Sequence, residues 1–147
     1  MWYRYIRKAH YHETDMMGMI HHSNYLRWME EARIAFTDDN GISYTGMEAE
    51  GITSPIASLS IDYVSPARFG DILEVALCIT RYSGAVLEIS YEITDSAGHR
   101  PVVRASTRQG FIKNGRPVSL KKAMPGWHEK MLSLADIYSG ENDKSSD

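Results

Sequence analysis

Two hydrophobic periods divide the chain near residue 54. Over residues 23–38, apolar side chains recur every three or four positions, which is the spacing of one face of an α-helix. The recurring positions are Tyr25, Met29, Ala32 and Phe36. We expect Ser23 or Asn24 to cap the start of this helix. Its end is expected near Thr37, because the two aspartates that follow would oppose the helix dipole.

Beyond residue 54 the hydrophobic period is two, which is the period of half-buried β-strands. Apolar and polar residues alternate within 57–63, 73–79 and 87–94, and a weaker alternation runs from about 99 to 113. The breaks between these runs carry turn-forming residues, among them Gly70-Asp71, Ser83-Gly84 and Asn114-Gly115. Short connections of this kind predict four strands in an antiparallel meander.

A sheet of four long strands must bury one face, and residues 23–38 form the only long apolar helix available to cover it. Residues 2–9 are predicted to form an edge strand, and residues 125–138 a short C-terminal helix. The expected fold class is therefore α+β, with an antiparallel sheet wrapped around one long central helix. We expect one domain over residues 1–138, followed by a polar, flexible tail over 139–147.

Composition narrows the classes of function. The chain has 147 residues and a formal net charge of -3, with 16 Lys+Arg against 19 Asp+Glu, so no basic face for nucleic acid is expected. No apolar run approaches the ~18 residues of a membrane span. Cys78 is the only cysteine, so no disulfide can form within one chain. A cytoplasmic location is the expectation that follows.

The segment from Tyr11 to Tyr25 carries the candidate chemistry, because an acid, a glycine and a predicted helix start follow one another within it. Asp15 lies in a loop three residues before Gly18, which permits a tight turn. His22 then meets the first turn of the helix, where free N–H groups favour a developing negative charge. A carboxylate beside such donors suits hydrolysis of an acyl group by water. The residue types alone fit Asp15 equally well as an ordinary turn residue. A histidine pair at a helix start is more often surface or capping material than catalytic.

Histidines cluster in the same segment, since four of the six lie between residues 10 and 22. A zinc site is the alternative that such a cluster raises. His10 and His12 share one side of an extended segment, whereas His21 and His22 are adjacent and point apart, and no His-x-x-x-His pair occurs. We therefore expect no metal. Cys78 lies on the polar face of its strand without a partner base, so it is interpreted as a packing residue.

The residues around this loop resemble a family signature. The matching run is Glu13-Thr14-Asp15-x-x-Gly18-x-Ile20-x-His22-x-Asn24-Tyr25-x-x-Trp28-x-Glu30-x-Ala32-Arg33. It is similar to the signature of the 4-hydroxybenzoyl-CoA thioesterase-like family of hotdog-fold acyl-CoA thioesterases. The resemblance covers residues 3 to about 134 and is supported by Pro125 and by a second block, Asp62-Tyr63-x-x-Pro66-Ala67-x-Phe69-Gly70-Asp71. It implies the hotdog fold, in agreement with the order of elements expected from the pattern.

The resemblance implies a role for six positions. Asp15 matches the family's catalytic aspartate, as nucleophile or general base. His22 matches the start of the central helix, where its backbone N–H would polarise the thioester carbonyl and its imidazole could assist. Four further positions match residues of the loop, the helix entry and the substrate pocket: Gly18, His21, Asn24 and Tyr25. His21 stands where relatives often carry an aromatic residue, and Met16-Met17 replace smaller residues, so the acyl pocket is expected to differ.

The implied activity is hydrolysis of an acyl-CoA thioester to a free acid and CoA, with no cofactor beyond the CoA that the substrate carries. The family implies a homodimer or homotetramer with sites at the subunit interface, and no nucleic-acid or membrane partner is expected. Candidate cations for the CoA phosphates lie at strand ends or just beyond: Arg81, Lys113, Arg116, Lys121 and Lys122. Two alternatives stay open, a non-catalytic acyl-CoA-binding hotdog protein and a hotdog hydratase or dehydratase.

Overall fold

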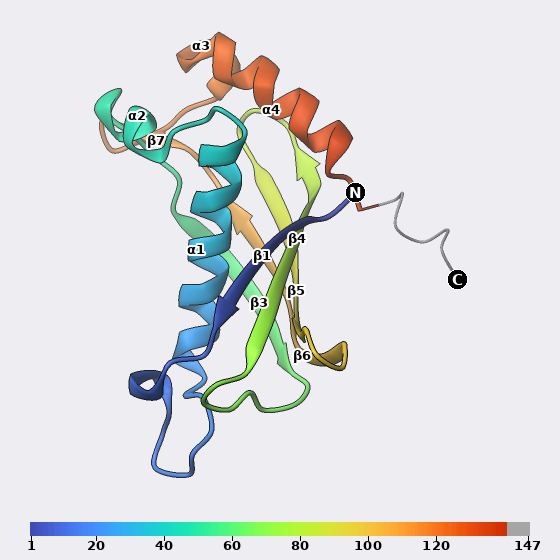
Figure 1. The fold of residues 1–147 in the computed structure, drawn as a ribbon. Coiled ribbons are helices and arrows are strands. Elements are labelled where there is room, and N and C mark those ends of the chain that lie inside the picture. Colours follow the sequence, from blue (N-terminus) through green and yellow to red (C-terminus); the bar gives the residue numbers. More distant parts are fainter. Residues whose placement is uncertain (141–147) are drawn as a thin grey trace.

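A five-stranded antiparallel sheet wraps around one long helix, α1 (Ser23–Asp39), in the computed structural model, which describes residues 1–140 (Figure 1). The strands lie in the order β1-β4-β5-β6-β3. Their bounds are β1 (Tyr3–Lys8), β3 (Ile56–Tyr63), β4 (Ile72–Tyr82), β5 (Leu87–Asp95) and β6 (Arg100–Gln109). This arrangement confirms the α+β hotdog fold expected from the sequence.

Shorter elements gather mainly at the end of the molecule where α1 finishes (Figure 1). A small second sheet joins β2 (Ile52–Thr53), β7 (Ile112–Lys113) and β8 (Arg116–Pro117). The helices there are α2 (Tyr44–Ala49), α3 (Leu120–Ala123) and α4 (Pro125–Ile137). A single 3-10 turn, η1 (Tyr11–Glu13), lies at the opposite end, between β1 and α1. No helix of the described residues is both long enough and apolar enough to cross a membrane.

The core lies between α1 and the concave face of the sheet. Trp28 and Phe36 of α1 are almost fully buried against strand residues such as Leu77 and Ile89. Each large apolar side chain removed from water in this way contributes roughly 1.5–3 kcal/mol. The apolar side chains of the strands and of the helix, which produced the two periods in the sequence, therefore pack into one core. That core fixes the position of the start of α1.

The helix begins and ends slightly differently from the expectation. His22, rather than Ser23 or Asn24, occupies the N-cap position, and no side chain caps the helix there. Asn24 is unavailable as a cap because its side chain is turned back onto the preceding loop. The helix also continues two residues beyond Thr37, and Asp39 at its end accepts a hydrogen bond from the Tyr3 hydroxyl at 2.6 Å.

The predicted four-strand meander is confirmed only in part. Strands β4, β5 and β6 are joined as neighbours, but β3 pairs with β6, and β4 pairs with β1. The connection over residues 64–71 is too long for a tight hairpin and carries the chain from one edge of the sheet toward the other. This crossing brings the segment around Ala67 beside the loop that precedes α1, where the Ile20 N–H donates to the Ala67 carbonyl at 2.8 Å.

The end of the chain differs in detail from the expectation. The fourth strand stops at Gln109, and residues 112–117 form a separate hairpin that turns at Asn114-Gly115. The C-terminal helix is present as α4. Gly140 is buried and donates its N–H to the Met1 carbonyl at 3.3 Å. Most of the expected tail, residues 141–147, lies outside the described residues, so the tail stays a prediction.

Candidate active site

Asp15 stands at the base of a tight turn whose tip projects from the molecule beside the start of α1. The Asp15 N–H donates to the Met19 carbonyl at 2.7 Å, which closes the turn. Carboxylate Oδ1 accepts the backbone N–H groups of Met17 at 2.8 Å and Met19 at 3.2 Å. Oδ2 takes no part in the hydrogen bonds that hold this turn. One oxygen therefore orients the carboxylate, and the other remains available to a reactant.

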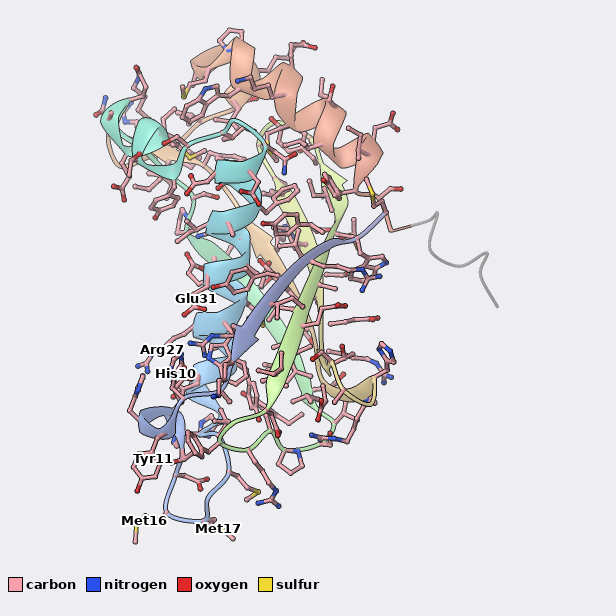
Figure 2. All side chains as sticks on the ribbon, viewed as in Figure 1. His10, Tyr11, Met16, Met17, Arg27 and Glu31 are labelled. Carbon is pink, nitrogen blue, oxygen red and sulfur yellow. The ribbon has the colours of Figure 1, made fainter. Side chains whose placement is uncertain are left out.

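Gly18 is required by the shape of this turn. Its φ is +77°, which strains any residue with a Cβ atom, and its N–H donates to the Asp15 carbonyl at 3.3 Å. Met16 and Met17 form the tip and point away from the protein (Figure 2). Asp15 is thus a turn-forming residue, as one of the two interpretations of the sequence expected, and its catalytic role stays a prediction.

Glu13 anchors the loop from inside, although no role was predicted for it. Its side chain is only 6% exposed and accepts two hydrogen bonds from Arg7, at 2.6 and 2.8 Å. It also accepts the indole N–H of Trp28 at 2.7 Å and the backbone N–H of His10 at 2.8 Å. A single buried carboxylate therefore ties β1, the loop and α1 together. Trp28 and Arg7 meet Glu13 only in the folded chain, so the local sequence carried no clear signal for these two contacts.

Asn24 and Tyr25, both predicted site residues, are buried and hold the loop rather than facing solvent. The Asn24 side-chain amide donates to the carbonyls of Glu13 at 2.9 Å and His21 at 3.3 Å. The Tyr25 hydroxyl accepts the N–H of Ala67 at 3.1 Å. Burial raises the pKa of Tyr25, and the Ala67 N–H opposes that rise, so the phenol is neutral at physiological pH. Both side chains fix where the chain enters α1.

His22 marks the start of α1 and is exposed. Its neighbours in the turn all use their backbone N–H groups: His21 donates to the Glu13 carbonyl, Ser23 to the His21 ring, and Asn24 to the His21 carbonyl. The His22 N–H is not among the donors that hold this turn. The local hydrogen bonds do not use this N–H at the helix N-terminus. It can therefore donate to a carbonyl oxygen that gains negative charge.

The histidines form two separate pairs rather than one cluster. The rings of His10 and His12 stack at 5.4 Å, and those of His21 and His22 lie 4.3 Å apart. Among the described residues, no three His, Cys, Asp or Glu side chains are placed to hold a metal ion. The His21 ring instead contacts the Ser23 hydroxyl at 2.8 Å, and the His22 ring meets Tyr63 edge to face.

The cations proposed for CoA phosphates are not beside Asp15. Lys113 and Arg116 belong to the β7–β8 hairpin, and Lys121 and Lys122 belong to α3, at the end of the molecule opposite to the Asp15 turn (Figure 1). Arg81 lies near the end of β4 and faces Glu88 at 3.9 Å.

The comparisons with known proteins agree on one family. Residues 9–130 match the family profile described as "Thioesterase-like superfamily". The putative acyl-CoA thioesterase YneP of Bacillus subtilis (strain 168) is 35% identical over 122 residues, which cover 82% of this chain and 88% of that protein. A 1,4-dihydroxy-2-naphthoyl-CoA hydrolase of Picosynechococcus sp. is 31% identical over 143 residues, which cover 92% of this chain and 98% of that protein.

Solved structures show the same similarity in three dimensions. The DHNA-CoA thioesterase of Staphylococcus aureus superposes with a TM-score of 0.87 at 30% sequence identity, over 92% of both chains. The family profile spans most of the chain, and the sequence relatives cover most of both proteins. The chain therefore belongs to the thioesterase-like superfamily and is a hotdog-fold thioester hydrolase, as its sequence predicted.

Proposed function

We propose that the protein hydrolyses acyl-CoA thioesters, with Asp15 as general base or nucleophile and the His22 N–H as the donor to the thioester carbonyl. The observation that carries the proposal is that one short segment, residues 15–22, presents both groups. Asp15 is oriented through one carboxylate oxygen, while the helix start presents an N–H that the turn does not use. A fixed acceptor of protons and a fixed donor to an oxyanion are the two requirements of acyl transfer.

The reaction follows from this geometry. The thioester carbonyl accepts the His22 N–H, and the helix dipole favours the negative charge that develops on its oxygen. Asp15 Oδ2 removes a proton from water as the water attacks, or attacks the carbonyl itself and is released by water in a second step. The C–S bond then breaks and CoA leaves as its thiol. The chemistry needs no cofactor beyond the CoA of the substrate.

The names of the relatives support CoA as the thiol. One is a putative acyl-CoA thioesterase and another hydrolyses 1,4-dihydroxy-2-naphthoyl-CoA, so both act on, or are expected to act on, CoA esters. CoA esters belong to metabolism inside the cell, and a chain with one buried thiol, Cys78, suits a reducing compartment. We therefore place the activity in the cytoplasm.

A second copy of the chain completes the site in this proposal. β3 is an edge strand of eight residues, and most of its side chains are exposed, among them Ile56, Leu59 and Tyr63. An uncovered apolar edge strand is a template for pairing with another strand. A two-fold axis through the middle of β3 would join two sheets antiparallel and would turn the second copy end for end.

This reversal would explain how cations at the end of the chain opposite to Asp15 can contribute to its site. It brings the β7–β8 hairpin and α3 of the second copy to the end of the first copy where Asp15 lies. Lys113, Arg116, Lys121 and Lys122 make no ion pair within the described residues, so they are open to phosphates. We propose that each active site takes its carboxylate from one chain and its phosphate-binding cations from the other.

A panel of acyl-CoA esters tests the proposal against the two alternatives. The wild-type protein is incubated with aromatic, short-chain, long-chain and 2-enoyl CoA esters. The release of free thiol and the mass of each product are then measured. We expect free CoA and the free acid from at least one ester. A hydrated ester with its thioester intact would indicate a hydratase, and bound but unchanged ester would indicate a binding protein. Either result would contradict the proposal.

A further inference from the structure

Large apolar side chains are exposed at the end of the molecule that carries the Asp15 turn. Met16 and Met17 have exposed fractions of 104% and 75%, and Tyr11 and Phe69 have exposed fractions of 76% and 58%. Figure 2 shows Tyr11, Met16 and Met17 together at this end. We call the set of Tyr11, Met16, Met17 and Phe69 the apolar tip. Exposed apolar side chains that gather in one place on a soluble protein mark a surface that binds a partner or a membrane.

Two loops are joined to form the apolar tip. Met19, which closes the Asp15 turn, forms an antiparallel bridge with Arg68, directly before Phe69. The rings of Tyr11 and Phe69 then meet edge to face, with their centroids 5.8 Å apart. The apolar tip is therefore a fixed surface built from both loops, and its side chains are held outward by backbone pairing.

Unpaired cations adjoin the apolar tip. Lys8 and Arg68 are exposed, and neither forms an ion pair within the described residues. Two of the three acids in residues 8–22 and 66–71, Glu13 and Asp71, each lie within 4 Å of an arginine. Asp15 is then the one acid of these segments without an arginine or lysine partner among the described residues. The surface is thus apolar at its tip and cationic beside it.

A lipid bilayer fits this surface better than a protein partner does. A stable protein interface uses about 20–30 residues a side in complementary shapes, whereas the apolar tip offers four side chains on a projection. Unbranched methionines can enter the acyl-chain boundary of a bilayer without a matching groove, and a tyrosine ring suits the boundary between membrane and water. Lysine and arginine beside them are attracted to anionic headgroups.

We propose that the apolar tip docks the protein on a bilayer that contains anionic phospholipids, with Met16 and Met17 inserted and with Lys8 and Arg68 at the headgroups. This docking is peripheral and needs no spanning segment. It therefore departs from the expectation of no membrane partner, which rested on the lack of a long apolar run. Asp15 directly precedes Met16, so docking holds the proposed active site against the lipid surface. The inference goes beyond the proposed thioesterase function and does not depend on it.

Co-sedimentation with vesicles tests the docking. The wild-type protein is mixed with vesicles of phosphatidylcholine alone and with vesicles of an equimolar mixture of phosphatidylcholine and phosphatidylglycerol. We expect the protein to sediment with the mixed vesicles, to bind phosphatidylcholine alone more weakly, and to lose binding to the mixed vesicles as salt is added. A protein that stays in solution with both kinds of vesicle would overturn the proposal and leave another protein as the occupant of the tip.

Substitutions in the apolar tip identify the side chains that insert. Met16→Ser combined with Met17→Ser removes the apolar surface and keeps the backbone N–H that Asp15 accepts from position 17. We expect this double variant to bind mixed vesicles about tenfold or more weakly. Leu132→Ser is the matched control, because Leu132 is 42% exposed on α4, away from the Asp15 turn (Figure 1). Equal binding by the double variant and the wild type would overturn the proposal.

Charge and subunit contacts are tested with the same vesicles and variants. Lys8→Gln combined with Arg68→Gln is expected to lower binding to mixed vesicles by about tenfold. Arg108→Gln is its control, since Arg108 is 52% exposed at the other end of β6. Light scattering of the methionine double variant should give the same oligomer size as the wild type. A smaller oligomer would place the apolar tip in a subunit interface and would contradict the docking.

A fluorescent probe locates the contact with lipid. Cys78 is the only cysteine and is buried, so Met17→Cys supplies a single exposed thiol for an environment-sensitive dye. We expect the emission of this dye to rise and shift to the blue when mixed vesicles are added, and we expect no change for the dye at Leu132→Cys. Equal responses at the two positions, or no response at position 17, would overturn the proposal. None of these measurements depends on hydrolysis, so the docking and the proposed activity can fail separately.

Discussion

At the scale of single residues, the loop that presents Asp15 depends on the buried carboxylate of Glu13. That carboxylate accepts hydrogen bonds from Arg7, Trp28 and the His10 backbone, and the Glu13 carbonyl accepts from Asn24 and His21. Removing one partner of a buried ion pair leaves the other charge uncompensated. The cost of losing Glu13 should therefore be far larger than that of losing an exposed carboxylate.

Glu13→Gln is expected to lower the free energy of unfolding by about 3 kcal/mol, because Arg7 loses its buried counter-charge. Glu31→Gln is the matched control, since Glu31 also contacts Arg7, at 3.1 Å, but is 41% exposed. We expect it to cost less than about 1 kcal/mol. Urea unfolding of the three proteins measures the difference. Equal losses in the two variants would show that Glu13 is not the anchor of the loop.

The sequence predicted Asp15 but not Glu13, and the reason is physical. Asp15, Gly18 and the helix start are neighbours along the chain, so their spacing alone describes a turn that leads into a helix. Two side-chain partners of Glu13, Arg7 and Trp28, come from β1 and α1, and only tertiary folding brings them to it. Asn24 was expected at the helix entry, yet its contact with the Glu13 carbonyl became visible only in the structure.

At the scale of elements, the start of α1 carries the proposed oxyanion donor. Any residue at position 22 with a backbone N–H would supply that donor, so the imidazole should matter much less than the N–H. The φ of His22 is -57°, which lies within the range that proline adopts. Proline at this position would therefore remove the N–H while fitting the local backbone.

Two substitutions of His22 separate these contributions. His22→Ala removes only the imidazole, and we expect kcat to fall by no more than about tenfold. His22→Pro removes the N–H as well, and we expect a further loss of about 10²-fold, which is typical of a lost oxyanion donor. Steady-state kinetics, with melting temperatures as the folding control, compare the two. Equal activity of the Ala and Pro variants would refute the N–H assignment.

The positions of the helices and strands were largely predictable from the sequence, but the pairing of the strands was not. Alternation located the long strands, and helical spacing located α1, because both patterns are local. The pairing of β3 with β6 joins strands about 45 residues apart, and the turn-forming residues Gly70-Asp71 in the connection over 64–71 wrongly favoured β4 as the neighbour of β3. Long-range pairing is decided by the packing of the whole core rather than by any short segment.

At the scale of the whole molecule, a single chain leaves the edge strand β3 unpaired on one side. An apolar cleft between α1 and β3 borders the same exposed edge strand. Pairing through β3 would bury this edge and add the cations of the second copy to the site. Dimerisation and activity should therefore fail together.

Ser60→Asp tests this coupling, because Ser60 is exposed near the middle of β3, where a two-fold axis would bring both copies of the residue close together. Like charges there oppose pairing. Ser106→Asp is the matched control, since Ser106 pairs with Ser60 from the neighbouring strand β6. Light scattering should give twice 16.7 kDa for the wild type and for Ser106→Asp, but a monomer with little activity for Ser60→Asp. A fully active monomer would contradict the shared site.

The most direct test of the central claim is the kcat of Asp15→Asn with the best acyl-CoA ester of the panel. Asparagine keeps an Oδ1 acceptor for Met17 and Met19, so the turn should survive while the base and nucleophile are lost. Asp71→Asn is the control, because Asp71 accepts the Arg68 N–H in the adjacent turn in the same manner. We predict a kcat at least about 10²-fold lower for Asp15→Asn and near wild type for Asp71→Asn, at equal melting temperatures. An Asp15→Asn enzyme as fast as the wild type would contradict the account.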